Sequence, residues 1–148
     1  MPPVERWTHK FEIKPGSWIY APTPEAAEYG RRLKAELEGR ARFPRYYFHL
    51  RNGGHVKALA THVANTSFLH LDIKDFFGSI NRSKLTRVLK HYYRYTDARE
   101  IAVQSTVKRP DAGARAYVLP FGFVQSPILA SLSLRNSRLG TVLQELHE

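Results

Sequence analysis

The sequence predicts a single α/β (α+β) domain in which helices pack against a small sheet. Its 148 residues suit one domain, and 43% of them are hydrophobic, which is enough to bury a core. Several stretches place apolar residues at helical spacing, whereas residues 68–73 alternate as a half-buried strand does. Cysteine is absent, which excludes a disulfide scaffold, a thiolate metal site and a cysteine nucleophile.

The chain is strongly basic. It carries 23 Lys and Arg against 13 Asp and Glu, a formal net charge of +10. Polyanions are the expected partners, and nucleic acid is favoured over a membrane surface because eight Tyr and eight Phe could stack on bases. No apolar run reaches the roughly 20 residues that span a bilayer, and the first residues lack the order of a signal peptide. We expect a soluble, cytoplasmic protein; a merely basic protein without such a partner is the alternative.

The N-terminal half is expected to consist of short elements separated by turns. Glycine, proline and asparagine mark the turns, and the spacing of apolar and aromatic residues marks the elements. A hairpin return strand is an alternative to the second helix. The expected elements are, in order, an irregular or short-stranded arm to Pro22, a helix over 23–39 capped by Thr23, an aromatic strand over 43–50, a turn at 51–54 and a helix over 55–64.

The C-terminal half is expected to be mainly helical after one strand. The strand over 68–73 would turn Leu69, Leu71 and Ile73 to one face and Phe68, His70 and Asp72 to the other. Next are expected a helix over 83–93, a helix to about 108 with Asp97 and Glu100 as capping box, a loop at 109–113, an extended piece at 117–120, a turn at 121–125 and a helix from Ser126, its hydroxyl cap, to about 146.

Two carboxylates follow the strand predicted at 68–73. Asp72 ends the strand and Asp75 lies in the turn after it. Carboxylate oxygens beside a strand end are typical ligands of Mg²⁺, but acids that cap a turn look the same in sequence, and spacing alone leaves the two interpretations even. The seven histidines are dispersed, so we interpret His55, His62, His70 and His91 as packing or surface residues.

Residues 72–80, Asp-Ile-Lys-Asp-Phe-Phe-Gly-Ser-Ile, resemble motif A of bacterial reverse transcriptases of the retron, group II intron and phage-defence kinds. The resemblance implies that Asp72 is catalytic and binds two Mg²⁺ ions, with a backbone ligand from Ile73. It implies that the ring of Phe77 lies under the sugar of the incoming dNTP. Lys74, Asp75 and Phe76 would belong to the same nucleotide-binding segment.

Residues 119–130 are similar to motif B of the same family, a Leu-Pro-x-Gly turn followed by Ser-Pro and a helix. The resemblance implies that Phe121, Gly122 and Gln125 bind the nucleotide and that Ser126 and Pro127 support template and primer. Phe121 stands where the family usually has Gln, and Gln125 is displaced from that position. Upstream, the family carries its fingers, and there the resemblance assigns template and primer contacts to three basic residues, Arg45, Arg51 and Lys57.

The motif C hairpin of the family, aromatic-x-Asp-Asp, is missing from the sequence. The resemblance therefore implies an incomplete polymerase: N-terminal extension and fingers over 1–65, and the front half of the palm over 66–148. We expect RNA template, DNA primer and dNTP as partners, two Mg²⁺ ions in a complete site, and weak or no polymerase activity for this chain unless a partner chain or a missing C-terminal part completes the palm.

Three functions remain open on the sequence. The first is RNA-directed DNA polymerase, truncated before the Asp-Asp motif. The second is a non-catalytic, basic nucleic-acid-binding module derived from the same fold, and the third is an unrelated basic α/β domain. The first predicts that Asp72 and the helix beginning at Ser126 face each other across a nucleotide-sized cleft.

Overall fold

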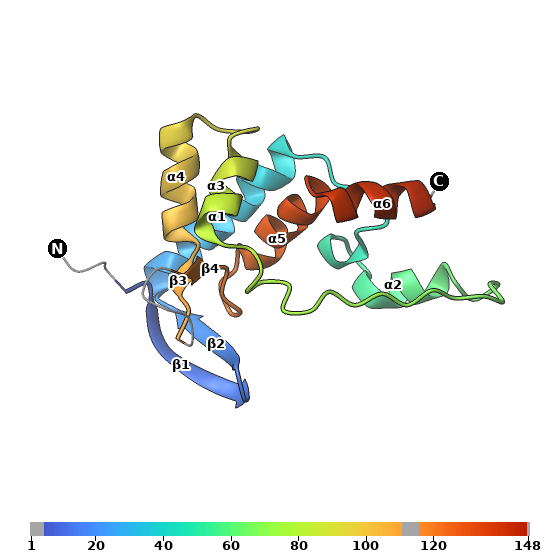
Figure 1. The fold of residues 1–148 in the computed structure, drawn as a ribbon, viewed down its shortest axis with the longest axis horizontal. Helices are drawn as coiled ribbons and strands as arrows, with labels where there is room; N and C mark the ends of the chain where they lie inside the picture. The colour runs from blue at the N-terminus through green and yellow to red at the C-terminus, as the bar shows by residue number, and fades with distance from the viewer. Residues whose placement is uncertain (1–4, 111–115, 148) are drawn as a thin grey trace.

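The computed structural model describes residues 5–110 and 116–147, so the loop predicted at 109–113 lies largely outside the described residues. The predicted mixed α/β class is confirmed: the described chain forms six α-helices and two small antiparallel sheets (Figure 1). The elements are β1 (Trp7–Lys14), β2 (Ser17–Pro22), α1 (Pro24–Arg40), a 3₁₀ helix (Phe48–Leu50), α2 (Gly54–Ala60), α3 (Arg82–Leu89), α4 (Tyr95–Gln104), β3 (Val107–Lys108), β4 (Tyr117–Val118), α5 (Ser126–Arg135) and α6 (Arg138–His147).

The N-terminal arm is a hairpin. β1 and β2 pair antiparallel, and Gly16 takes a φ of 81° at the turn, which glycine adopts without steric cost. Strand β2 is joined to the rest of the molecule by the Tyr20 N–H, which donates to the Phe121 carbonyl at 2.9 Å. The prediction of a short-stranded arm is thus confirmed.

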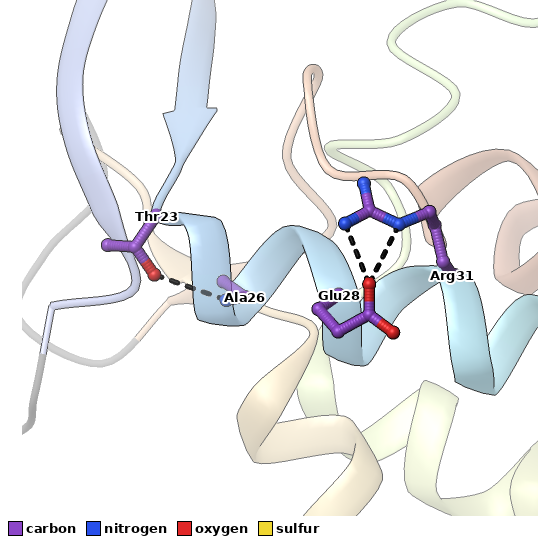
Figure 2. Close-up of polar contacts among 4 residues, drawn as sticks. All are labelled: Thr23, Ala26, Glu28 and Arg31. Carbon is purple, nitrogen blue, oxygen red and sulfur yellow. Dashed lines mark hydrogen bonds and ion pairs between the residues drawn. The ribbon is translucent and has the colours of Figure 1, made fainter.

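Helix α1 begins where the sequence predicts. The Thr23 hydroxyl accepts a hydrogen bond from the Ala26 N–H at 3.1 Å, and Glu28 pairs with Arg31 at 2.8 Å on the exposed face (Figure 2). Gly39 does not end the helix, which continues to Arg40.

The main core lies between α1, α3, α4 and α5. Its leucines and alanines are fully or almost fully buried, and each buried leucine side chain contributes about 1.5–3 kcal/mol relative to an exposed one. The hydrophobic residues of this core with 0% exposure are Leu37, Leu85, Leu89, Ala98, Ala102, Leu129, Ala130 and Leu132. Among the described residues no helix combines the length and the apolar character that crossing a bilayer requires.

Three helix boundaries differ from the prediction. Helix α3 ends at Leu89, before the predicted 93, and α4 ends at Gln104, before the short β3–β4 pair. Arg94, rather than Asp97, is the N-cap of α4, so the predicted capping box is wrong. Asp97 lies inside the first turn instead, where its negative charge still favours the helix N-terminus.

The predicted long C-terminal helix is two helices. Helix α5 ends at Arg135, and the side-chain amide of its C-cap, Asn136, donates to the Leu132 carbonyl at 2.9 Å. The Ser137 hydroxyl then accepts from the Gly140 N–H at 3.1 Å at the start of α6. Asn and Ser offer the backbone such local alternatives to a continuous helix, which explains the break.

Both predicted strands are wrong. Residues 43–50 form a turn followed by the 3₁₀ helix. In the turn, the Tyr47 N–H donates to the Pro44 carbonyl at 3.1 Å. Residues 68–73 are free of helix and strand, as the chain between α2 and α3 shows in Figure 1. The helix after the Asn-Gly-Gly turn is confirmed in preference to a hairpin, although α2 ends at Ala60. A strand needs a neighbour, and the described chain offers none at either place.

Candidate functional site

The two segments that carry the motif resemblance meet in the structure. The rings of Phe77 and Phe121 are stacked, with centroids 4.5 Å apart and an interplanar angle of 27°. Beside them the Leu119 N–H donates to the Ile80 carbonyl at 3.2 Å, and Asn81 forms an antiparallel bridge with Val118. Residues 75–81 and 117–121, far apart in sequence, therefore form one continuous surface.

The hairpin fixes the second of these segments. Ile19 forms a parallel bridge with Phe121, next to the hydrogen bond from Tyr20. Gly122 has a φ of 105°, and a Cβ there would collide with the Tyr20 carbonyl oxygen. The glycine of the Leu-Pro-x-Gly turn is therefore required by the close approach of the hairpin as well as by its φ.

A shallow pocket of about 60 Å³ lies where the hairpin, the turn after residue 74 and the β3–β4 pair converge. Trp18 and Tyr20 line it from the hairpin, and Asp75, Arg109 and Phe121 line it from the other two elements and the turn at Phe121. A volume of about 60 Å³ holds only a few waters by the usual measure. The pocket is thus too small to enclose a ligand as large as a nucleotide.

The carboxylate of Asp75 forms an ion pair with an arginine side chain. Its Oδ2 pairs with the Arg109 guanidinium at 3.0 Å, and its backbone carbonyl accepts from the Ser79 N–H at 2.8 Å. Asp75 also has a φ of 47°, unusual for a residue with a side chain, and a Cβ at Gly78 would collide with its carboxylate. These contacts fit an acid that organises the turn, the second of the two interpretations of the sequence.

Asp72 lies on the exposed segment before this turn. Its side chain makes no hydrogen bond or ion pair with the residues that the structure describes, and Ile73 is half-buried at the wall of a groove beside α5 and α6. Over 5–110 and 116–147 no group of three or more His, Cys, Asp or Glu side chains is close enough to hold a metal ion. One isolated carboxylate does not fit a centre of two Mg²⁺ ions, which needs ligands from more than one strand.

Gln125 and Ser126 are in the core. Gln125 is 1% exposed, and its Nε2 donates to the Ser105 hydroxyl at 3.3 Å. Ser126 is 0% exposed and its hydroxyl has no partner among the described residues. The N-cap of α5 is Gln125 with no side-chain bond, so the predicted hydroxyl cap is wrong. The Ser126 side chain lies in the core because the apolar residues of α5 pack inward at this turn, and the predicted cleft between Asp72 and the helix beginning at Ser126 stays a prediction.

The remaining predicted residues are on the surface or half-buried. Phe76 is half-buried, with its ring 5.9 Å from that of Phe77, and Gly122 is exposed on its turn. Arg45 belongs to a groove with residues of α5 and α6, and no contact joins it to the Phe77–Phe121 pair among the described contacts. The exposed members of the set are Arg45, Arg51, Lys57, Lys74 and Pro127.

Some features of the site escape a reading of the sequence. The fold pairs Arg109 with Asp75 and brings Trp18 into the same pocket as Phe121, and the sequence has no signal for either arrangement. The Lys10 ammonium lies 5.0 Å from the ring centroid of Trp18, which the mixture of basic and aromatic residues in the arm hints at. Elsewhere the ring of His49 is hydrogen-bonded to the Ser131 hydroxyl at 2.6 Å, and partial burial lowers the pKa of His49.

Comparison with known proteins adds no relative. No protein-family model matches the chain, and neither the curated proteins nor the solved structures contain a significant match to it.

Proposed function

We propose that this chain is the nucleotide- and template-facing part of a reverse transcriptase-like, RNA-directed DNA polymerase. The observation that carries the proposal is the stacking of Phe77 on Phe121 at 4.5 Å. The stacking joins the two segments that carry the motif resemblance. If the resemblance were accidental, two unrelated coincidences would be needed: the match of both motifs in the sequence and the contact between them in the structure. In this proposal the aromatic pair is the platform on which the sugar and base of a nucleotide lie.

The charge of the chain supports a polyanionic ligand. The net charge is +10, and Lys74, within the first motif segment, is exposed. Arg109 lies at the pocket edge beside Asp75. Binding that depends on such charges weakens with salt, because each neutralised phosphate releases counterions.

The proposal assigns binding, and no metal-dependent step, to the described residues. Nucleotide addition requires two ions held by several carboxylates, and Asp72 is alone among the residues that the structure describes. We therefore expect this chain by itself to bind primer–template without extending the primer. Extension would require further carboxylates beside Asp72.

A non-catalytic nucleic-acid-binding module is the second candidate function. The ion pair between Asp75 and Arg109 favours it, because this acid is engaged in the protein and not free for a ligand. The two candidates share the aromatic platform. They differ in whether the chain also binds the dNTP that matches the template, which a polymerase remnant should do and a module that only binds nucleic acid should not.

Fluorescence anisotropy with a labelled DNA primer on an RNA template tests the proposal. Phe121→Ala should weaken binding several-fold, because a stacked base contributes about 1–3 kcal/mol. Tyr95→Ala is the matched control, since Tyr95 is an exposed aromatic residue (56%, against 45% for Phe121) on α4. Equal losses in the two variants, or none in either, would contradict the assigned site.

A titration with dNTP separates the two candidate functions. For a polymerase remnant, the dNTP that matches the template should tighten the complex with primer–template more than a mismatched dNTP does. For a module that only binds, neither dNTP should change the affinity.

A further inference from the structure

The longest stretch of unpaired backbone in the described chain is residues 66–74, which we name the open segment. Its residues form no backbone–backbone hydrogen bond with any other described residue. Its large apolar side chains face solvent: Phe68 is 71% exposed, Leu69 73% and Leu71 55%. In Figure 1 it is the extended chain that returns from α2 toward α3.

Such a segment is a template for another strand. A row of free N–H and C=O groups with alternating apolar side chains pairs readily with a second extended chain. The sequence of the open segment also sets conditions on that strand. It must supply apolar side chains opposite one face and, opposite His70 and Asp72 on the other face, groups of suitable charge.

We infer that the occupant is the open segment of a second copy of this chain, paired antiparallel about a two-fold axis at Leu71. In this register Leu71 lies opposite Leu71 of the second copy, and Leu69 lies opposite Ile73 on the same face. On the other face His70 lies opposite Asp72 and Phe68 lies opposite Lys74, and each of these pairs occurs twice. The same side chains of each copy thus contact the complementary side chains of the other, as a two-fold interface requires.

Other registers bring unlike faces or like charges together. An odd shift pairs apolar with polar faces, because side chains alternate along a strand. An axis at His70 pairs Phe68 with Asp72, and an axis at Asp72 pairs two carboxylates. A parallel, in-register pair also sets Asp72 against Asp72, and like charges directly opposite destabilise a sheet. The axis at Leu71 pairs apolar residues on one face and opposes no like charges on the other. Its one apolar–charged pair, Phe68 with Lys74, sets an aromatic ring against a cation, which is a favourable contact.

The apolar surroundings of Ile73 also suit a second copy of the open segment. Ile73 lines an apolar groove with Val88 of α3 and Leu139 of α6, and Leu139 is 41% exposed. In the inferred register Leu69 of the second copy lies beside Ile73, at the mouth of this groove. The strand pair would therefore cover side chains of the helices as well as the open segment. This inference does not depend on the proposed function.

Cysteine crosslinking tests the register, and the cysteine-free chain is a suitable background. Leu71→Cys should give a disulfide-linked dimer under oxidation, because directly opposite Cα atoms lie about 4.5–5.5 Å apart, within the range of a disulfide. Leu69→Cys alone should not, because its counterpart is four positions along the partner strand, about 13 Å away. Leu69→Cys combined with Ile73→Cys should crosslink again.

A charge swap tests the same register without oxidation. Measured by sedimentation equilibrium at about 0.15 M salt, where repulsion between basic chains is screened beyond about 8 Å, wild type should be dimeric at high concentration. His70→Asp should weaken the dimer at least several-fold by opposing two carboxylates. The double variant His70→Asp with Asp72→His should restore it, and circular dichroism verifies that each variant is folded.

Three results would overturn the inference. The first is a wild-type chain that stays monomeric at all accessible concentrations. The second is a Leu69→Cys variant that crosslinks as well as Leu71→Cys, which would indicate another register. The third is a double charge swap that dimerises no better than His70→Asp, since the charge pair would then have no part in the contact.

Discussion

The helical core and the region from α2 to the open segment have similar apolar patterns and opposite environments. Leu85 and Leu89, spaced i, i+4 on α3, are 0% exposed. Val56 and Leu59, spaced i, i+3 on α2, are 64% and 68% exposed, although the spacing predicts a buried face equally well. The difference is that α3 has α4 and α5 against it, whereas α2 contacts the short 3₁₀ helix beside it and has no buried residue.

This comparison shows what an apolar pattern specifies. It specifies which face of a helix or strand packs against another element. It does not specify whether that element belongs to the same chain. Exposed contiguous apolar residues on a soluble surface mark contact sites. The region from α2 to the open segment is therefore the part of the molecule where we expect association.

The largest effect should come from truncating matched leucines in the two regions. Leu89→Ala should lower the free energy of unfolding by about 2–5 kcal/mol, because it leaves a cavity in the core. Leu69→Ala, 73% exposed in wild type, should change it by no more than about 0.5 kcal/mol in dilute solution. Denaturant unfolding of both variants measures the difference, and equal losses would show that the open segment is packed.

The second effect concerns the attachment of the hairpin to the site. Gly122→Ala should destabilise through both its φ of 105° and the collision with the Tyr20 carbonyl. Gly16 has a φ of 81°, and no atom lies near the Cβ that alanine would add. Gly16→Ala should therefore lower the free energy of unfolding only by the about 1–2 kcal/mol that a non-glycine residue costs in the left-handed region. Thermal unfolding of the two variants compares them. If Gly16→Ala were the more damaging change, the tight contact at Phe121 would be in doubt.

The smallest effect should be a pH dependence at the border of the two regions, where His49 meets Ser131 of α5. Burial lowers the pKa of His49, so the unfolded chain binds a proton more readily. The contribution of His49 to stability is full above its ordinary pKa of about 6.5 and is lost as the pH falls through the lowered value. His49→Gln should flatten that part of the stability profile, and His91→Gln, on the exposed surface, should leave it unchanged.

Local signals in the sequence predict a good part of the fold. The cap at Thr23, the turns at Gly16 and Gly53 and the burial of α3 and α5 all depend on neighbours close in sequence or on helical periodicity. The two strands could not be predicted in the same way. The aromatic residues of 43–50 pack as a turn, and the alternation of 68–73 describes a strand that finds no neighbour among the described residues.

The candidate site follows a similar division. The resemblance brings residues 72–80 and 119–130 into one hypothesis, and the stacking of Phe77 on Phe121 agrees with that proximity. It does not predict that Asp75 pairs with Arg109 or that Gln125 and Ser126 are buried, because both depend on how α5 and the β3–β4 pair pack in three dimensions.

The most direct test of the functional account is a double-mutant cycle on primer–template affinity with Phe77→Ala and Phe121→Ala. If the stacked rings act as one platform, each single variant should lose about 1–3 kcal/mol and the double variant should lose little more than either. Fully additive losses, or no loss while the variants remain folded, would contradict the claim that the two segments form one nucleotide site.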